Sequence, residues 1–242
     1  MRAALLPVLF GSRTFLPQNV ATVLKWLDPT RGLYQDAAGT TPAPSDTNSV
    51  GLWQDQSGNG KHASQTQVSA PDKRPILKLG IAPLPMIRFD GVDDFLTSVL
   101  SGLAQPFTVF MVVKNLNLAP AADQNFYRGS SGAVFYTNHG DSDKLTMFGG
   151  SVLGSSAPSS GAHVYTQIWN GASSAAYGDG TLLFSGNAGA SGIVGALNIG
   201  AGTSGGSNTA VDLGDFIVCS GALASDPRQQ IESWLKPRWG VL

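Results

Sequence analysis

The stretch that decides the fold is Phe107-Thr108-Val109-Phe110-Met111-Val112-Val113-Lys114, a nearly continuous run of β-branched, aromatic and aliphatic residues. Such residues favour strands over helices. A run without polar alternation is typical of a strand that is covered on both of its faces. We therefore predict a central core strand over residues 107–114.

Downstream of this run, three short apolar segments are separated by turn dipeptides. Residues 163–169 are followed by Asn170-Gly171, residues 173–177 by Asp179-Gly180, and residues 181–184 complete the series. Asn-Gly and Asp-Gly supply the two positive φ angles of a type I′ hairpin turn. The pattern predicts a three-stranded antiparallel meander. Further strands are predicted at 86–89 and 95–96, joined by a corner at Asp90-Gly91, and at 132–137, 144–149, 196–200 and 213–219.

The composition agrees with a turn-rich β domain. The 242 residues include 30 Gly and 14 Pro, 42% are hydrophobic and only 13% are charged. The chain is therefore neither disordered by charge nor a long solvated helix. Its length suits one β-sandwich. Gly/Ser/Ala-rich segments at 150–161 and 186–208 are interpreted as solvent loops.

The C-terminal tail differs from the rest of the chain. Asp226-Pro227-Arg228-Gln229 offers an N-cap acceptor, a proline at the first helical position and a glutamine at the reciprocal capping position. Ile231, Trp234 and Leu235 then follow helical spacing. We predict one short amphipathic helix that ends at Pro237.

Several motifs occur in order along the chain: Trp26-Leu27-Asp28, the stretch 33–42, Trp53-Gln54-Asp55-Gln56-Ser57-Gly58-Asn59-Gly60-Lys61-His62-Ala63, the stretch 89–96, Tyr177-Gly178-Asp179-Gly180 and the tail 231–240. Taken together, they resemble those of laminin-G-like, concanavalin A-like jelly-roll modules, and most closely those of tailed phages and prophages. The resemblance covers residues 24–242 and implies an all-β, two-sheet antiparallel jelly-roll sandwich, which agrees with the strand pattern. We accordingly divide the chain into an apolar N-terminal arm, residues 1–20, and a jelly-roll domain, residues 21–242.

Charge and hydropathy exclude two classes of partner. The formal net charge is -1, and the basic residues are scattered from Arg2 to Arg238, so the basic patch of a nucleic-acid binder is absent. No apolar run approaches the 18 residues or so that a membrane-spanning helix needs. The single cysteine, Cys219, lies in an apolar run and is interpreted as a buried side chain.

Glycoside hydrolysis is the enzymatic activity that the fold suggests, and it normally requires two flanking carboxyl groups. The glucanase branch of this fold uses Glu-x-Asp-x-x-Glu on one strand, but Glu232, in the predicted tail helix, is the only glutamate here. A pair of aspartates is the remaining alternative, and the sequence shows no clear one. We therefore expect that the chain is not an enzyme and assign no catalytic residue; a glycoside hydrolase is the least favoured function.

Asp90, Asp93 and Asp94 form the densest acidic cluster. Loop carboxylates suit Ca²⁺, and related modules sometimes bind calcium at a sheet edge. The alternative, which we favour, is structural: Asp90 sets the geometry of the turn before Gly91, and Asp93 or Asp94 caps backbone amides. We expect no obligatory cofactor, with Ca²⁺ at these three residues as the alternative.

Sugar binding would use an exposed aromatic face with polar neighbours. The candidate platforms are Trp53, Trp169 and Tyr177. The alternative is that these rings pack in the core, which is the usual fate of a tryptophan on a strand.

The N-terminal segment Met1-Arg2-Ala3-Ala4-Leu5-Leu6-Pro7-Val8-Leu9-Phe10 has the charged start and apolar run of a signal peptide, but it is short and Pro7 interrupts it. We interpret it as an arm that docks on a neighbouring subunit through Leu5, Leu6, Val8, Leu9, Phe10 and Phe15. Together with the phage resemblance, this predicts a non-enzymatic structural protein of a phage particle: a decoration, tail-associated or fibre-attached subunit. Its partners would be other virion subunits, and a homo-oligomer is an open alternative. The second hypothesis is a carbohydrate-binding module that contacts host-surface glycans.

Overall fold

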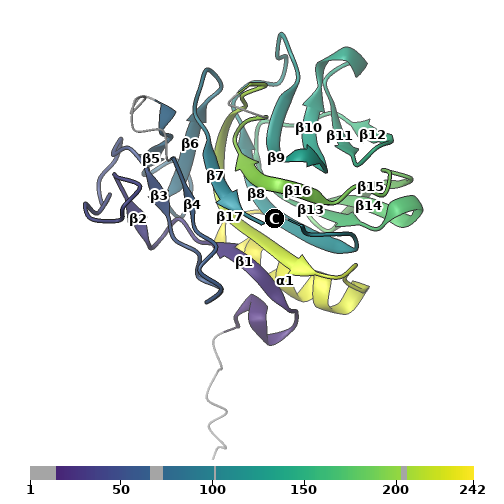
Figure 1. Cartoon of the computed structure of the whole chain (residues 1–242), viewed down its shortest axis with the longest axis horizontal. Coiled ribbons are helices and arrows are strands. Elements are labelled where there is room, and N and C mark those ends of the chain that lie inside the picture. The colour runs from purple at the N-terminus through teal and green to yellow at the C-terminus, as the bar shows by residue number, and fades with distance from the viewer. Residues whose placement is uncertain (1–14, 66–72, 101, 203–205) are drawn as a thin grey trace, which may run out of the picture.

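The computed structural model describes residues 15–65, 73–100, 102–202 and 206–242, which form two stacked antiparallel β-sheets and one α-helix (Figure 1). Three short 3-10 turns complete the described elements: η1 (Pro17–Asn19), η3 (His139–Asp141) and η4 (Gly171–Ser173). The predicted all-β, two-sheet jelly-roll sandwich with one C-terminal helix is confirmed.

The first sheet has eight strands among the described residues, and the predicted core strand lies near its middle. In spatial order they are β15 (Thr181–Gly186), β14 (Ser174–Gly178), β13 (Ala162–Trp169), β8 (Phe107–Asn115), β17 (Ala210–Ser220), β6 (Met86–Asp90) and β5 (Ile76–Lys78), and β1 (Val23–Leu27) also pairs with β17.

The second sheet has nine strands in the part of the chain that the structure describes. Their order is β12 (Val152–Ser156), β11 (Lys144–Phe148), β10 (Val134–Asn138), β9 (Gln124–Gly132), β16 (Ile193–Ile199), β7 (Leu96–Val99), β4 (Ala63–Ser64), β3 (Leu52–Trp53) and β2 (Leu33–Tyr34).

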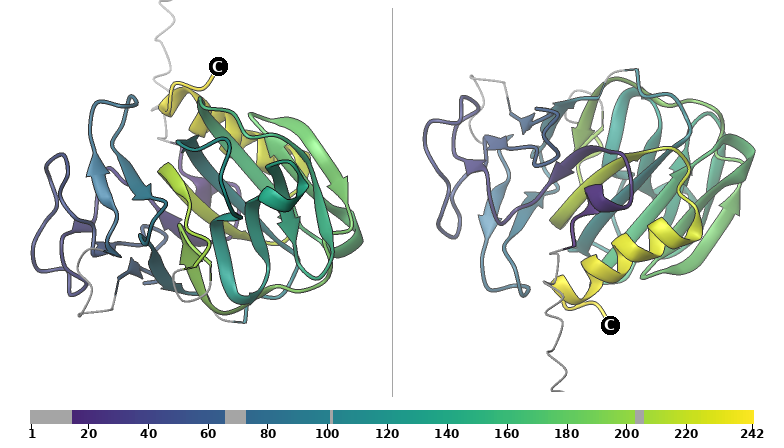
Figure 2. Two further views of the ribbon diagram at one scale, coloured as in Figure 1. Left: turned by 90° about the horizontal axis from the view of Figure 1, so that it is seen from above. Right: turned by 90° about the horizontal axis from the view of Figure 1, so that it is seen from below.

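Strand β8 explains why the molecule has two apolar cores. Its alternate side chains, such as Val109 and Met111, face the second sheet. Phe110 and Val112 point to the opposite side, where they pack with Ile231 and Leu235 of helix α1 (Ser225–Arg238). Figure 2 shows α1 running across the outer face of the first sheet. The prediction that this strand is covered on both faces is confirmed.

The ends of α1 differ from the prediction. The N-cap is Ala224, which makes no side-chain capping bond, and Pro237 lies inside the helix, which ends at Arg238. A proline inside a helix removes its own N–H donor and crowds the carbonyl four residues earlier. The last turn still closes, because the N–H of Trp239 donates to the carbonyl of Leu235 at 3.1 Å.

The two hairpin turns of the predicted meander have different outcomes. Asp179 and Gly180 have φ angles of +54° and +86°, so the turn between β14 and β15 has the two positive angles that were predicted. Asn170 has a φ of -151°, and the connection between β13 and β14 is the 3-10 turn η4. The Ser174 hydroxyl explains this difference, because it accepts from the Asn170 N–H and donates to the Gly171 carbonyl, both at 2.9 Å.

Three further predictions about connections are wrong. The segment after Asp90-Gly91 does not join paired strands, because β6 and β7 lie in different sheets and the chain crosses between them. The segment 150–161 contains β12, which pairs with β11 at the edge of the second sheet. The segment 186–208 contains β16, which pairs with β7 and β9. A glycine- and serine-rich sequence can occupy an edge strand, where pairing with one neighbour replaces apolar burial.

Candidate functional site

A pocket lies on the outer face of the second sheet, where β9, β10, β11 and β12 are neighbours. Across these strands Arg128 is opposite Val134, Val134 is opposite Phe148, and Phe148 is opposite Val152. Side chains of directly paired residues project to the same face of a sheet. The four residues therefore form one continuous row across four strands.

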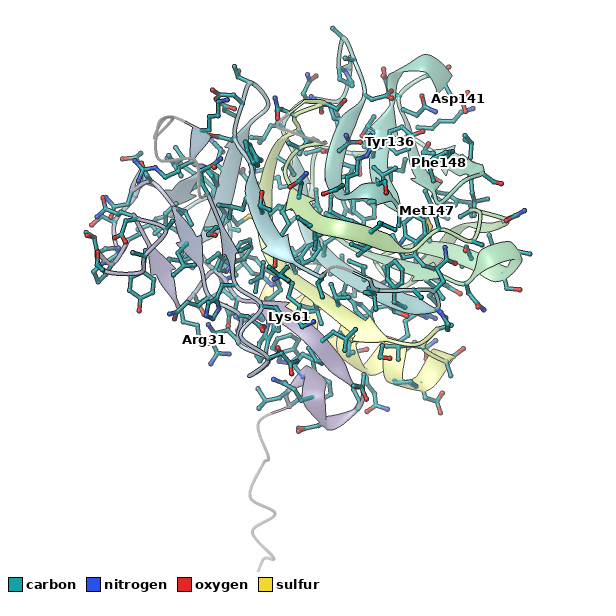
Figure 3. The ribbon with its side chains drawn as sticks, viewed as in Figure 1. Arg31, Lys61, Tyr136, Asp141, Met147 and Phe148 are labelled. Atoms are coloured by element: carbon teal, nitrogen blue, oxygen red, sulfur yellow. The ribbon has the colours of Figure 1, made fainter. Side chains whose placement is uncertain are left out.

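A second row borders the first. It runs from Asn125 to Tyr136, Thr146 and Gly154, again in direct register. Figure 3 shows Tyr136 and Phe148 on neighbouring strands, with Asp141 at the end of the hairpin that joins these strands. Gly154 has no side chain, so nothing on β12 covers this end of the row.

The two rows enclose a pocket of about 210 Å³. Its floor is buried, and Val152, which is 60% exposed, forms an outer wall. Asp123, just before β9, and Ser207, just before β17, add polar groups at the rim. The lining residues are Asp123, Asn125, Arg128, Val134, Tyr136, Phe148, Val152 and Ser207.

The pocket is lined by one basic and one acidic side chain, Arg128 and Asp123. The Nε atom of Arg128 is buried and has no hydrogen-bond partner in the described protein. Burial raises the pKa of the Tyr136 phenol, the carboxylates of Asp123 and Asp141 raise it further, and the Arg128 guanidinium opposes them. The pocket therefore offers hydrogen-bond donors and acceptors beside apolar walls, an arrangement suited to binding a small polar ligand.

The acidic cluster that was predicted from the sequence is present. One carboxylate oxygen from each of Asp90, Asp93 and Asp94 lies within 4.8 Å of the others, so these side chains could hold a cation. Asp90 Oδ1 accepts from the Val92 N–H at 2.7 Å, and Asp94 Oδ2 accepts from the Asp90 N–H at 2.9 Å. Burial and the neighbouring Asp90 raise the pKa of Asp94 to about 7. The predicted turn-setting role is confirmed, and calcium binding stays a prediction.

The structure contradicts Trp53 and Trp169 as sugar-stacking platforms. Both rings are fully buried. The Trp169 indole N–H donates to the Tyr127 hydroxyl at 2.8 Å, and its ring stacks on Phe107. These inward-facing positions lie between the two sheets, where side-chain area is removed from water, so neither ring can present a face to a ligand.

Tyr177, the third predicted platform, is half-buried, but its ring lies against a protein cation. The Arg228 guanidinium sits 3.9 Å from the ring centroid. Arg228 in turn donates to both carboxylate oxygens of Glu232, at 2.8 and 2.6 Å, and Glu232 also accepts from the Thr166 hydroxyl. The single glutamate of the chain is thus buried in an ion pair that fastens α1 to β13.

A second charged cluster lies under the other end of α1. The carboxylate of Asp215 accepts from the indole N–H groups of Trp26 and Trp239, both at 2.7 Å, and from Arg238 at 3.0 Å. Arg238 also donates to Asp28 at 2.8 Å. Burial and the nearby Asp28 raise the pKa of Asp215. All of these polar groups are partnered within the protein, so the cluster is structural.

Cys219 lies on the first sheet beneath α1, in the apolar cluster with Val23 and Ile231. Burial raises the pKa of its thiol to about 12. The prediction of a buried cysteine is confirmed.

A shallow groove of about 600 Å³ runs along the outer side of α1. Phe15 borders it and contacts Trp234, with ring centroids 5.9 Å apart. Of the predicted docking residues, Leu5, Leu6, Val8, Leu9 and Phe10 lie outside the described residues, and Phe15 is the first residue that the structure describes. The groove is lined by Phe15, Asp226, Gln229, Gln230, Ser233, Trp234 and Pro237.

Comparison with known proteins supports the fold. No protein-family model matches the sequence, and no curated protein matches it. A sialidase from Trypanosoma rangeli has a similar structure at 12% identity and a TM-score of 0.58, over 87% of this chain and 32% of that one. The receptor binding domain of botulinum neurotoxin C/D mosaic serotype gives 11% identity and a TM-score of 0.63, over 93% and 55%.

The receptor binding domain of botulinum neurotoxin type G is similar as well, at 11% identity and a TM-score of 0.61, over 91% of this chain and 54% of that one. The chain thus spans about a third of the sialidase and about half of each toxin domain. Identities this low establish a shared β-sandwich fold and nothing about activity. In the described residues, no helix is long and apolar enough to cross a membrane.

Sequence reasoning missed the pocket on the second sheet. Its lining comes from four strands and two loops, and only the strand register brings these residues together. One signal was available. Tyr136 and Phe148 are large aromatic residues that alternate with the core-facing Phe135 and Met147, as expected for strands with bulky side chains on both faces.

Proposed function

We propose that this chain is a non-catalytic structural subunit of a phage particle, which docks on neighbouring subunits through its apolar N-terminal arm and the groove on α1. The observation that carries the proposal is the contact between Phe15 and Trp234 at the edge of that groove. The motif resemblance to phage modules supports a place on a virion. Leu5, Leu6, Val8, Leu9 and Phe10 of the arm precede Phe15 in the sequence.

Apolar burial is sufficient for such docking. At about 25 cal/mol per Å², burial of roughly 400 Å² of arm surface contributes about 10 kcal/mol before ordering costs are subtracted. The arm of one copy would lie in the α1 groove of the next, against Phe15, Trp234 and Pro237. Repetition of this contact would link subunits through non-covalent contacts alone.

The absence of catalysis is part of the proposal. Glu232 is held by Arg228 and Thr166 under α1, and Asp215 is held by two indoles and Arg238. A carboxyl that serves as acid or nucleophile in glycoside hydrolysis must reach the scissile bond. These buried carboxylates cannot do so.

Deletion of residues 1–16 tests the docking role. We expect the shortened protein to stay folded, with a melting temperature lowered only by loss of the Phe15–Trp234 contact, and to lose incorporation into particles, measured by mass spectrometry of purified particles. Leu182→Asp, at a position 51% exposed on β15, is the matched control and should be incorporated normally. Unchanged occupancy of the shortened protein would refute the proposal.

The pocket on the second sheet supports a second candidate function, a carbohydrate-binding module that contacts glycans. Aromatic residues, apolar walls and convergent polar groups are the usual composition of a saccharide site. The similar toxin domains are named as receptor binding domains, and the similar sialidase has been solved with difluorosialic acid. The two functions are compatible, because the pocket and the α1 groove lie on different sheets.

A further inference from the structure

The pocket on β9–β12 is lined by a buried hydrogen-bond donor that the described part of the protein leaves unsatisfied. The guanidinium of Arg128 keeps a buried Nε–H without a partner. A buried donor without a partner costs roughly 1–3 kcal/mol, so a ligand acceptor at this atom is favoured. The side chain stands in the row that continues through Val134, Phe148 and Val152.

We propose that this pocket binds one ring of a neutral saccharide, with Arg128, Asp123 and Asn125 fixing hydroxyl groups and Tyr136, Phe148 and Val152 contacting the C–H face. The inference rests on the second candidate function and names its site and ligand class. Each sugar hydroxyl both donates and accepts. A site with a guanidinium donor and a carboxylate acceptor at its rim therefore matches neighbouring hydroxyls.

The charges select a neutral ligand over an acidic one. Arg128 is the only cation that lines the pocket in the described structure, and the carboxylate of Asp123 lines it as well. Beyond the rim, Asp141 and Lys144 form an ion pair at 3.0 Å. The lining therefore carries one positive and one negative charge, so no surplus positive charge remains for a carboxylate-bearing sugar, and Asp123 would repel its anion.

The volume selects a single ring. Pockets for drug-sized ligands measure about 300–1,000 Å³. This pocket, at about 210 Å³, is smaller. The position of Val152, 60% exposed, leaves one side open toward the edge of the sheet. Further rings of an oligosaccharide would extend there.

The test is ligand-observed saturation-transfer NMR on the full chain with neutral oligosaccharides of glucose, galactose, mannose and N-acetylglucosamine, and with lactose against sialyllactose as a matched neutral and acidic pair. We expect saturable binding of at least one neutral glycan at millimolar or lower concentration. We also expect acidic derivatives to bind no more tightly than their neutral parents.

Variants locate the site. Arg128→Gln should weaken the binding of that glycan about tenfold or more, since a hydrogen bond to a charged donor is lost. Val152→Asp should abolish binding by placing a charge on the apolar wall. Val99→Asp is the matched control, because Val99 is 68% exposed on β7 of the same sheet but does not line the pocket, and it should bind normally.

Three results would overturn the inference. If no glycan in the panel, neutral or acidic, shows saturation transfer, the pocket is not a saccharide site and the second candidate function is refuted as well. If binding is equal in the wild type, Arg128→Gln and Val152→Asp, glycan binding stands but its site is elsewhere. If only sialyllactose binds, glycan binding stands and the neutral-ligand assignment is wrong.

Discussion

The charged clusters beneath α1 and the pocket on β9–β12 contain the same kinds of polar group, but they differ in whether those groups have hydrogen-bond partners within the protein. Under the helix, Asp215 accepts three hydrogen bonds and Glu232 is bound by Arg228 and Thr166. In the pocket, Arg128 has an unpartnered donor. Charged groups that satisfy one another hold the fold together, whereas groups left unsatisfied beside apolar walls are available to a ligand.

The largest effect on stability is expected at Asp215. We expect Asp215→Ala to lower the free energy of unfolding by about 3–5 kcal/mol, because two buried indole N–H groups lose their acceptor and Arg238 loses one of its two carboxylate partners. Urea denaturation measures the change. Arg128→Gln, in the pocket, should change stability by less than about 0.5 kcal/mol. Comparable losses in the two variants would remove the distinction.

The ion pair of Glu232 and Arg228 gives the next largest effect. Glu232→Leu alone should cost about 3 kcal/mol, since Arg228 stays buried without its partner. The double variant Arg228→Met, Glu232→Leu should recover most of that loss, because an apolar pair of similar volume can replace a buried ion pair. Thermal and urea unfolding of the three proteins form the test. A double variant less stable than Glu232→Leu would show that the charges themselves hold α1 in place.

Lys25 should make the free energy of unfolding depend on pH. Its ammonium is fully buried and donates to the Lys61 carbonyl and the Ser98 hydroxyl, and burial lowers its pKa to about 7. Between about pH 7 and 9 the unfolded chain keeps a proton that the folded chain releases, so the free energy of unfolding should rise by about 2 kcal/mol.

Urea denaturation at pH 7, 8 and 9 checks this prediction. Lys25→Met should flatten the profile over the same range. A wild-type stability that falls with pH over this range would contradict the assignment.

The smallest effect is expected at the acidic cluster. Asp90 and Asp94 are engaged by backbone N–H groups of their own turn. We therefore expect the melting temperature in 1 mM CaCl₂ to differ from that in excess EDTA by no more than about 1 °C, because a ligand that does not bind the folded protein does not stabilise it. A large stabilisation by calcium that Asp93→Asn removes would assign a metal site to Asp90, Asp93 and Asp94.

The strands with strong local patterns were predictable from the sequence. Residues 107–114 form most of β8, and Asp179-Gly180 forms the predicted turn between β14 and β15. The strands β2, β3 and β4 span two residues each, too short for any periodicity, and they exist because pairing holds them. The Asn170-Gly171 turn was missed because the Ser174 hydroxyl competes for the backbone.

The site was less predictable than the fold. A tryptophan on a strand faces either the core or the solvent according to register, which the sequence alone does not specify, and Trp53 and Trp169 face the core. The pocket depends on the register of four strands. Arg128 and Val152 are 24 positions apart, and no local motif joins them.

The central claim is that the α1 face is a docking surface and that the pocket face stays free. Hydrogen–deuterium exchange of the free protein and of the protein assembled in particles tests this claim most directly. We predict slower exchange in the assembled form at η1 and along Ser225–Arg238, with β9–β12 unchanged. Unchanged exchange along α1, or protection confined to β9–β12, would contradict the account.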